Sequence, residues 1–273
     1  LSKALVENSS ELLRPEDVER LLLEPSQHDR FIEETFQGIF FTPADLRFLD
    51  QTWANLRRFR NPYRKALVLS ALVRSCVKRQ PRGVFTVAGD PERYKDGRRD
   101  VRLSLREHFV EQVDVFNRSV FDNGRKSRSL HGDIFAVEPA GFDLVYMDPP
   151  YVPRADDNCY VKRYHFLEGL SCYWEGLTIL EESRVKKLKK PYTPFSYRRD
   201  ALAAFDRLFS HFRKSTLALS YSSNGYPDLE ELLRLMRRYK ASVTVFEREH
   251  RYHFGTHSAV QRAVVQEYLI LGV

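Results

Sequence analysis

Apolar residues recur every three or four positions through the first part of the chain, which predicts helices. Thr42-Pro43 starts one of them, because threonine caps a helix well and proline fits its first turn. Asn61-Pro62 starts another, and apolar residues cover so much of its circumference that it is expected to be central. Ser104-Leu-Arg-Glu107 is a capping box that opens a third. Shorter helices are expected at residues 1–8 and after Pro15.

From Ser129 onwards, short apolar runs alternate with amphipathic helices. This alternation predicts an α/β fold with a mostly parallel sheet and helices on both faces. The last two strands are joined by a loop with no room for a helix, so they should close the sheet as an antiparallel pair. The predicted helices are residues 200–212 and 227–239, and the predicted strands are residues 130–133, 142–147, 216–223, 242–247 and 263–271.

The change of pattern divides the chain into a helical region, residues 1–128, and an α/β core, residues 129–273. Residues 78–128 stand out within the helical region as basic and turn-rich. They include a short strand-like run at residues 83–87.

The composition of the chain favours a negatively charged partner. The chain has 273 residues, a net charge of +7 and 13% aromatic residues. Basic residues interleaved with aromatic ones suit a polyanion such as nucleic acid, although basic surfaces also serve solubility. Three cysteines without Cys-x-x-Cys spacing argue against disulfides and zinc. With neither a signal peptide nor a run of about eighteen apolar residues, a cytoplasmic protein without a membrane segment is expected.

The most informative stretch is Asp148-Pro149-Pro150-Tyr151, directly after an apolar strand. Two consecutive prolines cannot donate ladder hydrogen bonds, so the strand must end here. The acid and the aromatic ring are therefore presented at the carboxyl end of a strand, where open α/β sheets bind their ligands. A proline-rich turn after a core strand is the structural alternative.

This stretch resembles the catalytic motif of S-adenosylmethionine-dependent amino-methyltransferases, and its acidic first residue suits the adenine-N6 branch. Similar surroundings extend the resemblance to Dam-like adenine-specific DNA methyltransferases over residues 129–273. They are Gly132-Asp133, Tyr164-His-Phe-Leu-Glu-Gly-Leu170, Leu219-Ser-Tyr-Ser-Ser223 and Tyr252-His-Phe-Gly255. The resemblance implies a Rossmann-like class I methyltransferase sheet, with a largely helical insertion before the catalytic strand. Residues 78–128 are then the candidate for target recognition.

The resemblance also implies roles for the motif. The Asp148 carboxylate and the Pro149 carbonyl would accept both hydrogens of the target amine, which makes its nitrogen a better nucleophile. Pro150 would hold that geometry, and Tyr151 would stack on a base flipped out of duplex DNA. No metal ion and no covalent enzyme intermediate are required.

Further residues are implied to bind the cofactor and the target. Asp133 and Phe166, with Asp148, would bind S-adenosylmethionine; a strand-end cap and a core aromatic residue are the alternatives for the first two. The strand end Ser220, Tyr221 and Ser222 would line the target pocket, or would simply be polar.

Basic residues are candidates for DNA contact. Lys189 and Arg198 belong to the densest basic and aromatic tract, which could track phosphates or be a solvated loop. His253 lies in a basic hairpin, where DNA contact or plain exposure is favoured over metal binding.

One part of the family pattern is absent. No Phe-x-Gly-x-Gly turn follows a strand, and the second strand with its acid is also missing. The helix at residues 1–8 resembles the one that follows that second strand. We therefore expect an upstream segment or a companion N-terminal polypeptide to complete the cofactor site.

The leading hypothesis is a site-specific DNA adenine-N6 methyltransferase, active on double-stranded DNA in a restriction–modification system of a bacterium, an archaeon or a phage. An RNA or guanine-N2 methyltransferase is one alternative, because Asp-Pro-Pro-Tyr can serve those substrates. A non-catalytic DNA-binding subunit is the other, because the glycine-rich turn is missing.

Overall fold

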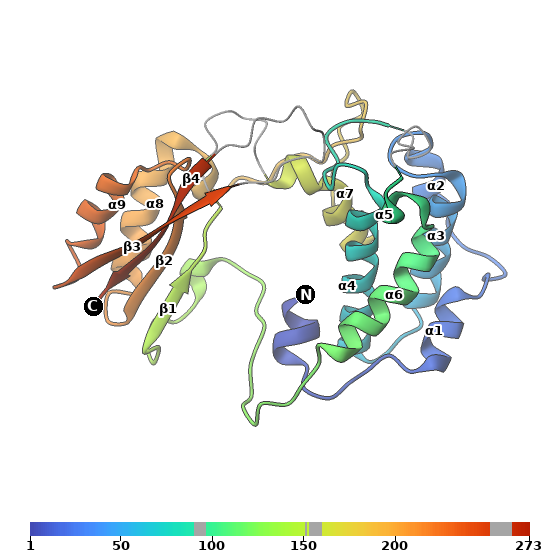
Figure 1. Ribbon diagram of the computed structural model, residues 1–273, viewed down its shortest axis with the longest axis horizontal. Coiled ribbons are helices and arrows are strands. Elements are labelled where there is room, and N and C mark those ends of the chain that lie inside the picture. The colour runs from blue at the N-terminus through green and yellow to red at the C-terminus, as the bar shows by residue number, and fades with distance from the viewer. Residues whose placement is uncertain (90–96, 151, 153–159, 252–263) are drawn as a thin grey trace. The chain divides into compact units, whose positions relative to one another are not determined.

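A computed structural model describes residues 1–89, 97–150, 152, 160–251 and 264–273 (Figure 1). The chain forms two compact units. Unit 1 comprises Leu1–Leu130 and Val161–Lys189, and unit 2 comprises His131–Tyr160 and Lys190–Val273. Each has a hydrophobic core of its own. No helix in the described part of the chain is both long and apolar enough to cross a membrane.

Unit 1 is helical, as the spacing of its apolar residues predicts. The helix starts are fixed by side chains: Thr42 accepts a hydrogen bond from the Asp45 amide, and Ser104 and Glu107 form the capping box. Its helices are η1 (Lys3–Glu7), α1 (Pro15–Leu22), α2 (Phe31–Thr35), α3 (Pro43–Leu56), α4 (Pro62–Arg79), α5 (Arg99–Arg102), α6 (Leu105–Arg118) and most of α7 (Tyr160–Cys172).

Helix α4 is central in unit 1, as expected, and packs against η1, α3, α5 and α6. Leu67, Val68 and Leu72 on α4 are fully buried. Beside this helical packing lies an aromatic cluster drawn from distant parts of the chain, which contains Phe36, Phe40, Phe41, Phe85, Phe166 and Trp174.

Unit 2 contains a four-stranded sheet in the order β1-β2-β4-β3. Strands β1 and β2 are parallel, and β4 runs antiparallel to both β2 and β3. The predicted fold class, a mixed α/β sheet with an antiparallel last strand, is confirmed. The strands are β1 (Leu144–Met147), β2 (Thr216–Ser222), β3 (Val243–Arg251) and β4 (Val264–Gly272), and the helices are α8 (Arg198–His211) and α9 (Leu229–Met236).

The expectation of helices on both faces of the sheet is wrong for the described part of unit 2. Helices α8 and α9 pack on the same face (Figure 1), where Phe205, Phe209 and Met236 meet Leu219 and Ile270. Two right-handed crossovers that advance across a sheet in one direction put their helices on one side. The opposite face carries exposed apolar side chains, namely Leu144, Tyr146, Phe246 and Leu269.

Two short predicted strands do not form. Residues 130–133 have no strand structure, and Asp133 instead caps the 3-10 helix η3 (Ile134–Ala136). Residues 83–87 are likewise irregular. Their apolar character reflects the insertion of Phe85 into the aromatic cluster, where its amide donates to the carbonyl oxygen of Arg163 at 2.8 Å. The short apolar run at residues 83–87 therefore reflects a buried side chain and not a strand.

Candidate functional site

The candidate site lies where β1 ends. Met147 is the last residue of β1, and Asp148 and the two prolines follow it directly. Met147 is aligned with Leu219 in the parallel β1–β2 pair, so Asp148 follows β1 at the level where Ser220 continues β2. The acid is exposed at the carboxyl end of a parallel pair of strands. This is the position at which α/β sheets bind ligands.

A hollow of about 270 Å³ opens beside Asp148. Phe195, Leu208 and Phe212 form one side of it, and Pro149 and Pro150 also contribute. Asp148 is the charged residue of a lining that is otherwise apolar or uncharged. A flat apolar ring with one polar edge matches this combination, because the ring can pack on aromatic side chains while its edge meets the carboxylate.

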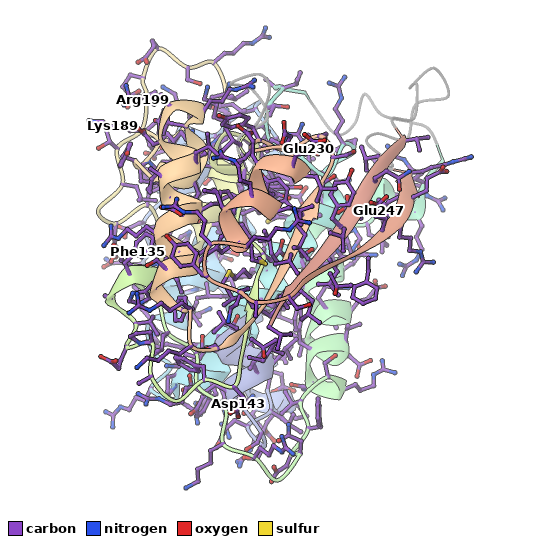
Figure 2. The ribbon with its side chains drawn as sticks, turned by 90° about the vertical axis from the view of Figure 1, so that its left-hand side faces the viewer. Phe135, Asp143, Lys189, Arg199, Glu230 and Glu247 are labelled. Atoms are coloured by element: carbon purple, nitrogen blue, oxygen red, sulfur yellow. The ribbon has the colours of Figure 1, made fainter. Side chains whose placement is uncertain are left out.

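Asp133 also lies in unit 2 and is exposed. Its carboxylate accepts a hydrogen bond from the Phe135 amide at 3.0 Å, which begins η3. Phe135 in turn packs on α8 (Figure 2), and the Arg207 guanidinium lies 3.9 Å from its ring centre. The capping role of Asp133 is thus structural, and its cofactor role stays a prediction.

The three predicted residues at the end of β2 divide between the two faces of the sheet. Tyr221 faces the helices, where its ring meets Phe205 and its hydroxyl donates to the carbonyl oxygen of Tyr226 at 2.5 Å. Ser220 and Ser222 face the opposite side, because side chains alternate along a strand. Ser220 is half-buried and Ser222 is buried. Tyr221 is thus a core residue of unit 2, and target contact by all three residues remains a prediction.

Phe166 is not brought together with Asp148 in one unit. It lies fully buried in unit 1, where its ring is stacked on Phe85 at 5.2 Å and meets the edge of Trp174 at 5.3 Å. These contacts account for an aromatic residue at this position without a ligand. The packing of Phe166 in unit 1 does not require a cofactor, so its contact with a cofactor remains a prediction.

The basic and aromatic tract forms ordered contacts. Lys189 is exposed in unit 1, and its backbone amide donates to the Thr178 carbonyl at 2.8 Å. In unit 2, Arg198 is exposed at the start of α8 and covers the Tyr226 ring at 4.4 Å. The Lys190 ammonium lies 4.5 Å from the Tyr197 ring. Lys190 belongs to the tract that the sequence indicated, whereas sequence reasoning missed Tyr226.

Two predicted site residues, Tyr151 and His253, lie outside the described residues. Within the described ranges no group of three His, Cys, Asp or Glu side chains is placed to hold a metal ion. The two cysteines among the described residues, Cys76 and Cys172, are free thiols.

Comparison with known proteins identifies several similar methyltransferases. The chain is 28% identical to Type II methyltransferase M2.HphI of Haemophilus parahaemolyticus, over 92% of this chain and 74% of that protein. It is 25% identical to modification methylase StsI of Streptococcus sanguinis, over 50% of this chain and 20% of that protein. It is 27% identical to modification methylase LlaI of Lactococcus lactis subsp. lactis, over 44% and 18% respectively. No protein-family model and no solved structure matches. The resemblance to DNA methyltransferases that the motifs indicated is confirmed.

Proposed function

We propose that this protein is a site-specific DNA adenine-N6 methyltransferase of a restriction–modification system, acting in the cytoplasm. The observation that carries the proposal is the Asp148-Pro149-Pro150 sequence at the carboxyl end of β1, beside an apolar hollow. Similarity to a type II methyltransferase over most of the chain supports the same conclusion.

The reaction requires a better nucleophile than a free adenine amine, because the nitrogen lone pair is delocalised into the ring. The Asp148 carboxylate and the Pro149 carbonyl accept the two amine hydrogens, which returns electron density to the nitrogen and aims its lone pair. Proline fixes φ and has no amide hydrogen, so the carbonyl is held rigidly. The target adenine is flipped out of the duplex, and Tyr151 stacks on it.

The methyl donor in this proposal is S-adenosylmethionine, whose sulfonium group supplies an activated methyl. Asp133 and Asp148 are exposed carboxylates in unit 2 and can accept hydrogen bonds from its polar groups. The sequence contains no Phe-x-Gly-x-Gly turn, whose backbone amides would approach S-adenosylmethionine closely. These residues therefore fit part of a cofactor site.

The remainder of the cofactor site is proposed to come from an additional polypeptide segment beside β1. Strand β1 pairs with β2 on one edge, and no described strand pairs with its other edge. Leu144 and Tyr146 on β1 are 56% and 62% exposed. Parallel strands are normally buried on both sides, so this edge and face suit a further strand and its helix. Titration calorimetry with S-adenosylmethionine tests this: tight binding by the chain alone would exclude it.

The catalytic assignment is tested by Asp148→Ala. This variant should lose transfer of a labelled methyl group to duplex DNA while keeping its affinity for that DNA, because the carboxylate acts on the amine and not on the phosphates. Asp143→Ala is the matched control, since Asp143 is an exposed acid at the other end of β1. Methylation by Asp148→Ala at the rate of the control would refute the assignment.

The same measurement separates the alternatives. Transfer to RNA or to guanine would favour the RNA or guanine-N2 reading of Asp-Pro-Pro-Tyr. DNA binding without transfer, even after addition of the upstream segment, would favour a non-catalytic DNA-binding subunit. That alternative is motivated by the missing glycine-rich turn.

A further inference from the structure

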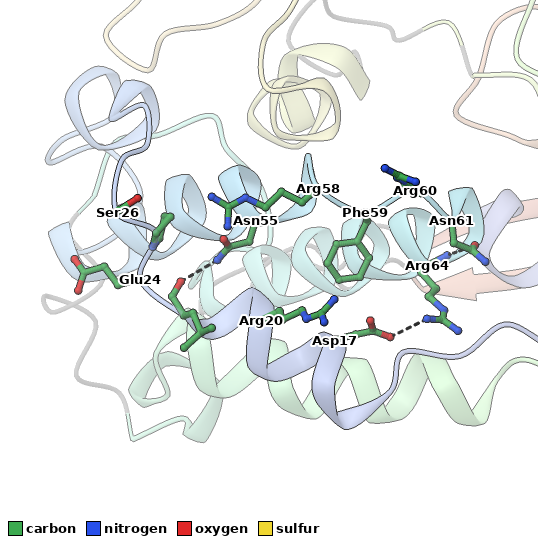
Figure 3. A pocket seen from close by; sticks show the side chains of 12 residues that line it. Asp17, Arg20, Glu24, Ser26, Asn55, Arg58, Phe59, Arg60, Asn61 and Arg64 are labelled. Atoms are coloured by element: carbon green, nitrogen blue, oxygen red, sulfur yellow. Dashed lines mark hydrogen bonds and ion pairs between the residues drawn. The ribbon is translucent and has the colours of Figure 1, made fainter.

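A hollow of about 660 Å³ lies in unit 1 among α1, the loop between α3 and α4, and the start of α4 (Figure 3). Arg20, Arg58 and Arg60 line it, together with the half-buried ring of Phe59. Figure 3 shows the guanidinium group of Arg20 near that ring and the guanidinium group of Arg58 towards Asn55. The hollow is far from neutral, because its arginines outnumber its acids.

The acids in this hollow are already engaged by other groups. Arg64 contacts Asp17 at 3.3 Å and Glu11 at 3.0 Å, and Glu24 accepts a hydrogen bond from the Gln51 amide at 3.3 Å. By contrast, Arg20, Arg58 and Arg60 are exposed, and their guanidinium groups have no ion pair or hydrogen bond within the part of the chain that the structure describes. Three guanidinium groups are thus available to an anion from outside.

A second hollow in unit 1, of about 700 Å³, is also basic. Arg125 and Lys126 line it from the loop after α6, and Tyr63 lines it from α4. This loop has a defined shape: Asp122 accepts from the Gly124 amide at 2.8 Å, and Gly124 has a φ of +73°. Arg125 and Lys126 are exposed, and among the described residues neither has an ion pair.

The start of α4 contributes residues to both hollows. Arg60 and Asn61 line the first, and Tyr63, two residues later, lines the second. Together the lining residues include eight arginines and lysines against four acids. We give the name basic band to the surface of unit 1 formed by Arg20, Arg58, Arg60, Arg125 and Lys126.

We propose that the basic band binds the phosphodiester backbone of DNA and so positions the duplex on unit 1. The inference rests on the proposed function for its choice of DNA as the polyanion. Guanidinium groups without carboxylate partners match phosphate oxygens, and contacts to phosphates fix the register of a protein on a duplex without reading bases. Of the predicted DNA contacts that the structure describes, neither Lys189 nor Arg198 lines either hollow.

The test is the salt dependence of duplex binding by the full chain. Each lost phosphate contact lowers the slope of log K against log salt concentration by about 0.9. Arg58→Gln/Arg60→Gln should therefore reduce the slope by about 1.8, and Arg125→Gln/Lys126→Gln by a similar amount. Arg74→Gln/Arg102→Gln is the matched control: it removes two exposed arginines of unit 1 that line neither hollow, and its slope should equal that of the wild type.

The outcomes distinguish the band from the proposed function. A slope for both band variants equal to that of the control pair would overturn the band while leaving methylation by the wild type intact. Failure of the wild type to bind duplex DNA would overturn both proposals. Binding to anionic lipid vesicles in place of duplex would also overturn the band. Circular dichroism of each variant confirms that the fold is kept.

Discussion

At the scale of single residues, a buried histidine of unit 1 gives a test of the packing around the aromatic cluster. His165 is fully buried and lies 2.8 Å from the Phe85 carbonyl oxygen through Nε2. Burial disfavours the imidazolium and lowers the pKa of His165 from 6.5 to about 4. The folded state therefore prefers neutral histidine, and this preference stabilises the protein above pH 6.5 and is lost as the pH falls to about 4.

We predict that the free energy of unfolding of unit 1 contains a contribution of up to about 3 kcal/mol from His165, which disappears between pH 6.5 and 4. Urea unfolding at several pH values measures it. His165→Gln is the control, because glutamine can donate to the Phe85 carbonyl without titrating. An identical pH dependence in the wild type and this variant would show that His165 is not responsible.

Residue-level prediction succeeded where a local rule applied. Asp148 was placed at a strand end because two prolines must end a strand, and that is its position. The burial of Phe166 could not be predicted in the same way. Its environment is assembled from rings as far away in sequence as Phe36 and Phe85, and a single sequence carries no record of those contacts.

At the scale of elements, one acid joins three helices of unit 1. Asp45 is the acid in the first turn of α3, a position where acids favour the start of a helix. In the structure it is only 3% exposed, and its carboxylate meets Arg79 Nε at 3.1 Å at the end of α4. It also accepts from the Leu105 amide at 2.7 Å at the start of α6. A local start signal therefore serves as a tertiary connection.

We predict that Asp45→Ala costs about 3–5 kcal/mol of unfolding free energy, since it leaves the buried Arg79 charge without its partner. Thr42→Ala is the comparison, because it removes only the cap of the same helix and should cost about 1 kcal/mol. Urea unfolding of both variants gives the two values. Equal costs would mean that the Arg79 pair contributes nothing beyond the cap.

The elements themselves were predictable to the extent that caps and apolar spacing are local. Helices α3, α4 and α6 begin where Thr42, Asn61 and Ser104 indicated. The placement of α7 was not predictable, because its core partners lie in the first hundred residues of the chain. The position of α8 and α9 on one face of the sheet was also missed. The alternation of strands and helices in the sequence does not tell in which direction successive strands are added to the sheet.

At the scale of the whole molecule, the chain builds two separate cores. Leu67 is fully buried in the core of unit 1, and Phe209 is fully buried in that of unit 2. The change of sequence pattern at residue 129 lies close to the end of the first segment of unit 1 at Leu130. The pattern of apolar and polar residues gave no indication that residues 161–189 belong to unit 1.

Separate cores should respond separately to cavities. Leu67→Ala removes buried methyl groups from unit 1 and should cost about 2–5 kcal/mol there, and Phe209→Ala should cost about 3–5 kcal/mol in unit 2. Because local stability is set by the contacts of each cooperative unit, amide hydrogen exchange should quicken in α4 and α6 for Leu67→Ala, and in β2 and α8 for Phe209→Ala. Each variant is the control for the other. Equal acceleration in both units by either substitution would mean that the two cores unfold as one, and the division into units would then describe packing without describing stability.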